Sequence, residues 1–411
     1  MNRDFRHRAK RANNSGDFPL VLGLLLVSGT AALGHEILWT RRMIDLLGAS
    51  AEASARVFEC FFLGLALGAA TVSFVLPRVR RPWRALGWVE LGVALFCLPA
   101  LFLPEWTGWI WPTLGAERLL SWPGSVLKTV LSVLIILPPA ILMGMTLPLA
   151  VSVLGERLPD LPRREIWLYA VNTLGGVLGL ALVVLLLLQW AGAFGSMLAM
   201  ITLNLAVAAK CFQRHRQKSH LDAKDALRAE TGPVSPLRFG GVPFFFAFFS
   251  GAGVLSLEVL GLAMANLAAP LAIYPQAGIL LCVILLLAVA AAAVPKWVRR
   301  FGAPAPILPD CLAAAALFIA VAPMVFMALP AVRAGYFGYG VGFEGFLGYW
   351  AGVTFLALGP AVLRCAGEGM TLSPITLYAH IDYGDTICGT SGDAALDLAL
   401  DFGFRAHPVL T

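Results

Sequence analysis

The sequence contains few charged residues. Asp, Glu, Lys and Arg make up 13% of its 411 residues, whereas a soluble domain carries about 25%. Because 59% of the residues are hydrophobic, the chain has too little polar side-chain surface to cover a water-soluble globule of this length. We therefore expect most of the chain to contact the lipid bilayer, and a soluble cytosolic enzyme is excluded.

The sequence also lacks the short motifs of common catalytic and metal-binding sites. It contains no GxSxG, no HExxH, no Walker loop and no GxGxxG after a strand. Its seven cysteines are scattered without a CxxC pair, so they indicate neither a disulfide framework nor a zinc site. The net charge of +6 comes from short basic clusters between apolar runs, which indicates membrane topology rather than nucleic-acid binding. We expect no catalytic residue, metal or cofactor.

Long apolar runs predict an all-α, polytopic membrane protein. A spanning helix needs about 20 mostly apolar residues, and ten runs qualify: 19–39, 57–77, 85–104, 126–151, 166–190, 192–210, 243–265, 272–294, 307–330 and 345–366. Most Lys and Arg residues lie before the first run or in alternate turns, and the opposite side receives only Arg41, Arg42, Arg56, Arg118 and Arg333. The positive-inside rule then predicts cytoplasmic N- and C-termini.

Part of the first half recurs in the second. Residues 28–39 read SGTAALGHEILW and residues 250–261 read SGAGVLSLEVLG, so Glu36 and Glu258 occupy equivalent positions. The phrase PPAILMGMTLP (138–148) also recurs, with an insertion, in GPAVLRCAGEGMTLSP (359–374). Because six spans precede the second copy, the two copies enter the membrane from the same side. This is a parallel repeat, similar to the two halves of major facilitator superfamily transporters.

The repeat divides the chain into five segments. They are a cytoplasmic basic N-terminus (1–18), a six-helix membrane bundle (19–210), a cytoplasmic linker (211–242), a four-helix membrane repeat (243–377) and a short acidic tail (378–411). One alternative stays open at the N-terminus, because a basic stretch followed by an apolar run also fits a cleaved signal peptide. Cleavage there would remove part of the first copy.

Ionisable residues inside predicted spans are the candidate functional residues. Inserting a charged side chain into the centre of the bilayer costs roughly 2.5–3.5 kcal/mol on insertion scales, so each one needs a partner or a function. Glu36 and Glu258 form either one acidic site between the two repeats or two structural pairs near the outer helix ends, with Arg41 or Arg42 as the mate of Glu36. Glu90 is expected to snorkel to the inner interface and pair with an arginine near it, such as Arg84. It is retained as a candidate for substrate binding.

The fifth run contains a polar residue followed by closely spaced glycines. In WLYAVNTLGGVLGLAL, Asn172 precedes Gly175 and Gly179, and Gly64 and Gly68 repeat the glycine spacing in the second run. Glycines four residues apart let helices approach closely, so tight packing is the first interpretation. Ligand binding by Asn172 is the alternative. His35 is either a proton relay or a packed polar residue.

Five phrases together resemble one family. With SGTAALGHEILWTRRM, FLGLALGAA, RRPWRALGWVELGVA, ILMGMTLPL and LYAVNTLGGVLG, the chain resembles the membrane module of bacterial membrane-fused spermidine synthases, the polyamine aminopropyltransferase family. The resemblance covers about residues 20–210 and extends weakly to 243–375. In that family a soluble Rossmann-like domain binds decarboxylated S-adenosylmethionine on a GGGDG-type loop, which this sequence lacks. The resemblance therefore implies that the chain belongs to this family through its membrane module and lies in a bacterial inner membrane. No catalytic residue of the family can be assigned to a position of this sequence.

Two functions remain open from the sequence. In the first, the protein belongs to polyamine metabolism as the membrane partner of a separate soluble aminopropyltransferase, or as the membrane part of a fused enzyme. In the second, it is a major-facilitator-like transporter of an organic cation or another small solute, and Glu36 and Glu258 meet the cation. A polyamine or another small cation is the expected small-molecule partner.

Overall fold

The computed structural model describes residues 2–47, 50–114, 122–154 and 161–222, together with isolated positions between 277 and 289 and Met324. Within these ranges the chain is helical and contains no strand. The main helices are α1 (Asn2–Leu47), α2 (Ser50–Val75), α3 (Pro82–Cys97), α4 (Leu103–Leu114), α6 (Trp122–Leu154), α7 (Leu161–Leu182), α8 (Leu188–Trp190) and α9 (Gly192–Asp222). Short turns η1 (Leu76–Arg78), η2 (Leu98–Phe102) and η3 (Val183–Leu187) connect some of them.

Six segments of the described residues are long and apolar enough to cross a membrane. They are Asp17–Leu47, Ala53–Val72, Pro82–Thr113, Trp122–Leu154, Arg164–Trp190 and Gly192–Lys218. Each contains or overlaps one of the first six apolar runs, so these spans are confirmed as helices, and the protein is a multi-pass helical membrane protein. Helices are the expected form, because a backbone in lipid must satisfy its hydrogen bonds within the segment. The four runs expected after residue 242 lie largely outside the described residues.

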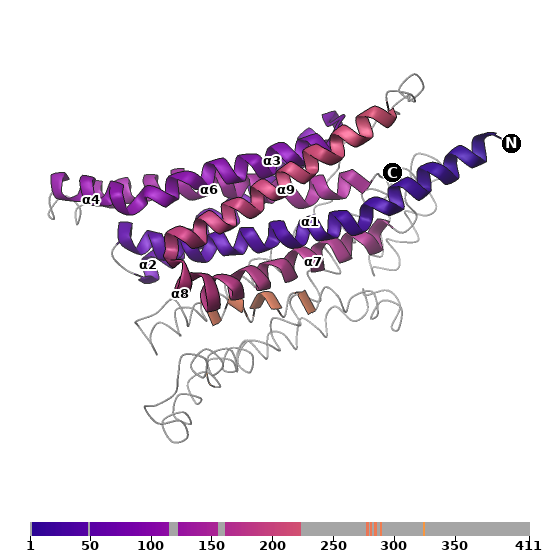
Figure 1. Ribbon diagram of the computed structural model, residues 1–411. Helices are drawn as coiled ribbons and strands as arrows, with labels where there is room; N and C mark the ends of the chain where they lie inside the picture. Colours follow the sequence, from indigo (N-terminus) through magenta and orange to yellow (C-terminus); the bar gives the residue numbers. More distant parts are fainter. Residues whose placement is uncertain are drawn as a thin grey trace, which may run out of the picture.

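The helices lie side by side in one bundle (Figure 1). The most extensive contacts join α1 to α7, α2 to α6, and α3 to both α6 and α9. α1 also packs against α9, α2 and α6, so it lies near the centre of the group. Gly192, the first residue of α9, follows the turn at Ala191 and has a φ of 62°, a left-handed conformation that favours glycine.

Glycines set the two closest helix contacts. A Cβ on Gly175 or Gly179 of α7 would lie 2.2 or 2.0 Å from a backbone oxygen of α1. In the α2–α6 contact, a Cβ on Gly68 would lie 1.9 Å from the backbone oxygen of Ile141. No side chain fits at such distances, so the backbones of both pairs touch. The predicted role of these glycine pairs in tight packing is confirmed.

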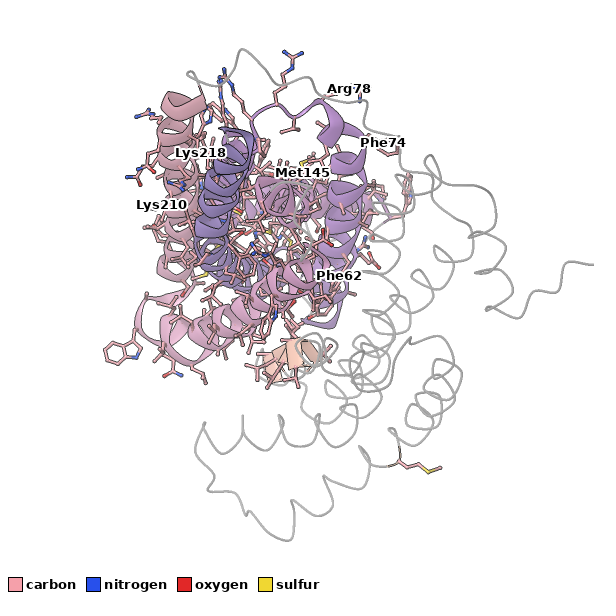
Figure 2. All side chains as sticks on the ribbon, turned by 90° about the vertical axis from the view of Figure 1, so that its right-hand side faces the viewer. Phe62, Phe74, Arg78, Met145, Lys210 and Lys218 are labelled. Carbon is pink, nitrogen blue, oxygen red and sulfur yellow. The ribbon has the colours of Figure 1, made fainter. Side chains whose placement is uncertain are left out.

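The two ends of the bundle differ in side-chain chemistry. At the end where the span of α1 begins and α9 finishes lie basic residues, which define the basic end: Arg78, Arg80, Arg81, Arg84, Arg164, Lys210, Arg214, Arg216 and Lys218. Figure 2 labels three of them, Arg78, Lys210 and Lys218. The opposite, aromatic end carries exposed tryptophans: Trp106, Trp109, Trp122 and Trp190. Basic residues at one end of the spans and tryptophans near a membrane–water interface are both typical of a helical membrane protein.

An ion cluster joins α1 to α9 at the basic end. Asp17 is only 1% exposed and accepts a hydrogen bond from Nε of Arg214 at 3.0 Å. Lys218 forms a second ion pair with the same carboxylate. This cluster fixes the start of the first span against the last turns of α9, which continues to Asp222 and so extends into the residues expected to form the linker.

Candidate functional site

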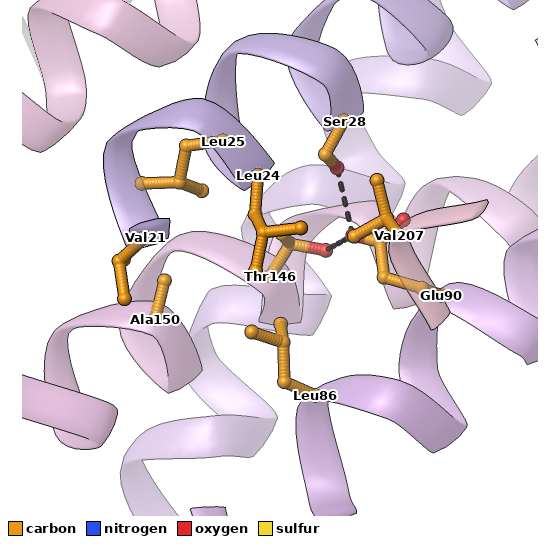
Figure 3. Close-up of a pocket in the computed structure, with 9 residues that line it drawn as sticks. All are labelled: Val21, Leu24, Leu25, Ser28, Leu86, Glu90, Thr146, Ala150 and Val207. Carbon is orange, nitrogen blue, oxygen red and sulfur yellow. Dashed lines mark hydrogen bonds between the residues drawn. The ribbon is translucent and has the colours of Figure 1, made fainter. Parts of the chain in front are cut away.

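Glu90 lies at the junction of four helices, where its carboxylate accepts three hydrogen bonds. Ser28 Oγ of α1 donates to Oε1 at 2.7 Å, and Thr146 Oγ1 of α6 donates to the same oxygen at 3.0 Å. Asn204 Nδ2 of α9 donates to Oε2 at 2.8 Å. Glu90 itself belongs to α3 and is fully buried. Figure 3 shows the Ser28 and Thr146 hydroxyls converging on the carboxylate. We call Glu90, Ser28, Thr146 and Asn204 the Glu90 cluster.

His35 extends the cluster along α1. Its Nε2 lies 3.3 Å from Oδ1 of Asn204. Because the Asn204 amide nitrogen is directed at the carboxylate, its Oδ1 can only accept, so Nε2 of His35 carries the hydrogen of this bond. The imidazole also stacks on Trp39, with ring centroids 5.7 Å apart. His35 therefore packs as a polar residue that orients Asn204, in agreement with the second of its two interpretations.

The donors around Glu90 are all neutral. Within the described part of the chain, no Lys or Arg lies within ion-pair distance of the Glu90 carboxylate. Burying a charge in an apolar medium is expensive unless it is paired, and intramembrane carboxylates are rare for this reason. Three hydrogen bonds reduce that cost without removing it. The cluster is thus suited to hold either a proton or a cation beside the carboxylate.

A small cavity adjoins the cluster. Ser28, Glu90 and Thr146 form one side of it, and the remaining lining is apolar: Val21, Leu24, Leu25, Leu86, Ala150 and Val207. Val21 and Leu86 lie near the starts of their spans, so this apolar part lies between Glu90 and the basic end. The free space of about 10 Å³ is room for about one water molecule.

The position of Glu90 corrects one sequence-based expectation. Snorkelling toward Arg84 at the interface is wrong, because Glu90 is 0% exposed whereas Arg84 is exposed. The reason is the face of α3 on which Glu90 lies. Leu86, Glu90, Val93 and Cys97 are all buried, and this spacing of three or four residues defines one stripe that faces the bundle interior.

Glu36 and Asn172 are not part of the Glu90 cluster. Glu36 is 1% exposed, and Arg41, one of its two expected partners, forms an ion pair with Asp45 at 3.6 Å. Asn172 lies in the α1–α7 contact, where a Cβ on Gly29 would meet its backbone oxygen at 2.1 Å. This geometry favours packing over ligand binding for Asn172. Glu258 lies outside the described residues.

Sequence reasoning missed three members of the cluster. Ser28, Thr146 and Asn204 are single polar residues in apolar runs, and hydroxyl residues inside membrane helices often bond only to their own backbone. Two of them carried a signal, because Ser28 lies in the repeated SG phrase and Thr146 in the repeated GMTL phrase. Asn204 had no such signal, and only the packing of α9 against α3 brings it to Glu90.

The described residues contain no group of three or more His, Cys, Asp or Glu side chains arranged to hold a metal ion. Comparison of the chain with protein-family models and with curated proteins finds no match.

Proposed function

We propose that the protein is a membrane component of polyamine metabolism, and that its bundle binds a polyamine or a similar organic cation at Glu90. The observation that carries the proposal is the Glu90 carboxylate, which is fully buried and surrounded by neutral donors. A protonated amine would supply the missing positive charge. The resemblance of the five sequence phrases to the spermidine synthase membrane module supports a polyamine as the amine.

The proposed topology has ten spans, with both termini in the cytoplasm of a bacterial cell and the basic end of the bundle facing it. The concentration of basic residues at one end of the bundle supports this orientation. The segments 19–210 and 243–377 would then be parallel repeats, as in major facilitator superfamily transporters. Reporter fusions in the 210–240 segment and at the C-terminus test the topology, and both should give a cytoplasmic signal. A periplasmic signal at either position contradicts it.

Amine binding requires the helices to separate. The cavity beside Glu90 has room for about one water molecule, whereas a polyamine is an elongated chain. The apolar side chains Val21, Leu24 and Leu86 lie between the carboxylate and the basic end. A cation that comes from the basic end therefore reaches Glu90 only when these side chains move aside, and alternating access needs a motion of this kind.

Two modes of action remain within this proposal. As a transporter, the bundle moves the cation across the bilayer. As a partner, it binds the amine for a separate soluble aminopropyltransferase. The transport mode is favoured by the enclosed position of Glu90 among spanning helices, and the partner mode by the family resemblance.

Uptake by proteoliposomes separates the two modes. Purified protein is reconstituted, and accumulation of radiolabelled spermidine is compared with that of empty vesicles and of vesicles carrying Glu90→Gln. Uptake that is lost in Glu90→Gln supports transport. Binding without uptake supports the partner mode, and the absence of both contradicts the proposed function. The same protein mixed with putrescine and decarboxylated S-adenosylmethionine should form no spermidine, since the sequence lacks the family's cofactor loop.

A further inference from the structure

The Glu90 cluster provides hydrogen-bond partners for the Glu90 carboxyl group in two protonation states. As a carboxylate, Glu90 accepts from Ser28, Thr146 and Asn204. With a proton on Oε1, it can donate to a hydroxyl of Ser28 or Thr146, because a hydroxyl is both donor and acceptor and rotates freely. Oε2 then remains the carbonyl oxygen that accepts from Asn204. In both states each oxygen of Glu90 keeps a hydrogen-bond partner within the cluster.

The two oxygens of Glu90 have different partners, which assigns the proton to one of them. Asn204 Nδ2 can only donate, and its orientation is held by His35 at 3.3 Å. A proton on Oε2 would face this donor, so Oε1 is the oxygen that takes the proton. Oε1 is also the oxygen bonded to Ser28 and Thr146, both of which line the cavity. The proton site therefore adjoins the space that leads toward the basic end.

We propose that Glu90 is a proton-exchange site of the membrane bundle. Its carboxyl group releases one proton from Oε1 to water entering from the basic end, and the positive charge of an amine group replaces that proton beside the carboxylate. The O–H bond breaks, the electron pair stays on Oε1, and the proton leaves on water. The exchange with an amine rests on the proposed function, whereas reversible proton binding at Glu90 does not.

Few other titratable groups face Glu90 from the helices packed against it. His35 of α1 faces it through Asn204, and Cys211 of α9 is buried in the same apolar cluster as Leu86 and Val89 of α3. Glu36 follows His35 on α1. The only charged residue of α6 is Lys128, whose Nζ bonds to the backbone oxygen of Leu47 at 3.4 Å, at the aromatic end. Glu36 is itself a buried carboxyl, so a proton-binding signal is assigned to Glu90 only where it depends on Glu90 or its hydrogen-bond partners.

Infrared difference spectroscopy tests proton binding without any ligand. The purified protein is titrated with acid, and the carbonyl stretch of a protonated carboxyl is followed. We expect a band that is absent in Glu90→Gln and retained in Glu59→Gln, because Glu59 is exposed on α2. If Glu90→Gln fails to fold, Ser28→Ala and Thr146→Val keep the carboxyl and remove one partner, so each should shift the band. A spectrum without any band that depends on these residues overturns the proposal.

Proton release on ligand addition tests the exchange. Putrescine is added to the protein in weak buffer with a pH indicator dye, at the pH where the infrared band has half its full intensity. The parent and Glu59→Gln should release protons, and Glu90→Gln should release none. Putrescine that binds by calorimetry without proton release overturns the exchange and leaves the proposed function intact. If putrescine does not bind, the proposed function fails, and the infrared titration alone decides whether Glu90 binds protons.

Discussion

Asn204 donates a hydrogen bond to Glu90 at 2.8 Å across 114 positions of sequence, and this contact joins α9 to α3 in the interior of the bundle. The orientation of the Asn204 amide group determines which oxygen of Glu90 accepts this bond. His35 holds the amide so that its NH₂ group meets Oε2 of Glu90, which leaves Oε1 to the two hydroxyls. Polar residues from three helices, α1, α6 and α9, thus surround one carboxylate of α3 in an otherwise apolar part of the core.

Removing one hydroxyl from the cluster should lower stability by about 1 kcal/mol, the usual size of a hydrogen bond between membrane helices. Thr146→Val keeps the shape of the side chain and removes the 3.0 Å bond to Glu90. The matched control is Thr129→Val in the same helix, because Thr129 bonds only to the backbone oxygen of Ser125. Thermal unfolding in detergent measures both. Equal melting temperatures for the two variants would show that the bond to Glu90 contributes nothing to folding.

Gly179→Ala should destabilise the α1–α7 contact by about 1–3 kcal/mol, the usual cost of an extra methyl group in a packed interface. The new Cβ would lie 2.0 Å from the backbone oxygen of Thr30, which cannot move without shifting α1. Gly23→Ala is the control, because no atom lies within 4 Å of a Cβ there. Denaturation in detergent should separate the two variants clearly. If Gly179→Ala is as stable as Gly23→Ala, the close approach of α1 and α7 is wrong.

Asp17→Asn should destabilise the basic end by more than about 1 kcal/mol. Its carboxylate is buried and pairs with Arg214 and Lys218, and removing one partner of a buried pair leaves the others uncompensated. Asp45→Asn breaks an exposed pair with Arg41 and should cost little, since exposed pairs contribute about 0–1 kcal/mol. Melting curves of both variants provide the comparison. If Asp45→Asn lowers the melting temperature as much as Asp17→Asn does, the stabilising role of the buried Asp17 pairs is wrong.

Glu36→Gln and Glu258→Gln test the second acidic site predicted by the repeat. If the two residues act together on a cation, each change should weaken binding of a cationic ligand by about fivefold or more, with folding largely intact. If Glu36 is a structural residue, Glu36→Gln should lower the melting temperature instead. Calorimetry and thermal unfolding of both variants decide between these outcomes. If the unmodified protein binds no polyamine, the proposed cation site at Glu36 and Glu258 loses its basis.

The helices were predictable from sequence because the bilayer restricts the choice. Once a run of apolar residues is long enough to span, a helix is almost the only form that satisfies its backbone. The glycine pairs were predictable for a similar reason, because Gly175 and Gly179 have few uses in a membrane helix other than close packing.

The site was less predictable, because it depends on which face of each helix is directed inward. Glu90 was recognised as a candidate, but its nearness to Arg84 in sequence suggested a surface pair. The burial of Leu86 and Val93 on the same face of α3 places it in the core instead. Asn204 reaches Glu90 only through the packing of α9, a contact that no spacing in the sequence encodes.

Calorimetric titration of the purified protein with spermidine tests the central claim most directly. Parent and Glu90→Gln are compared in the same detergent, with Glu59→Gln as the control for loss of a carboxylate on the exposed side of α2. The account predicts that the parent and Glu59→Gln bind with similar affinity, and that Glu90→Gln binds at least about tenfold more weakly, a difference of about 1.4 kcal/mol. Equal binding by the parent and Glu90→Gln, or no binding by the parent, would contradict it.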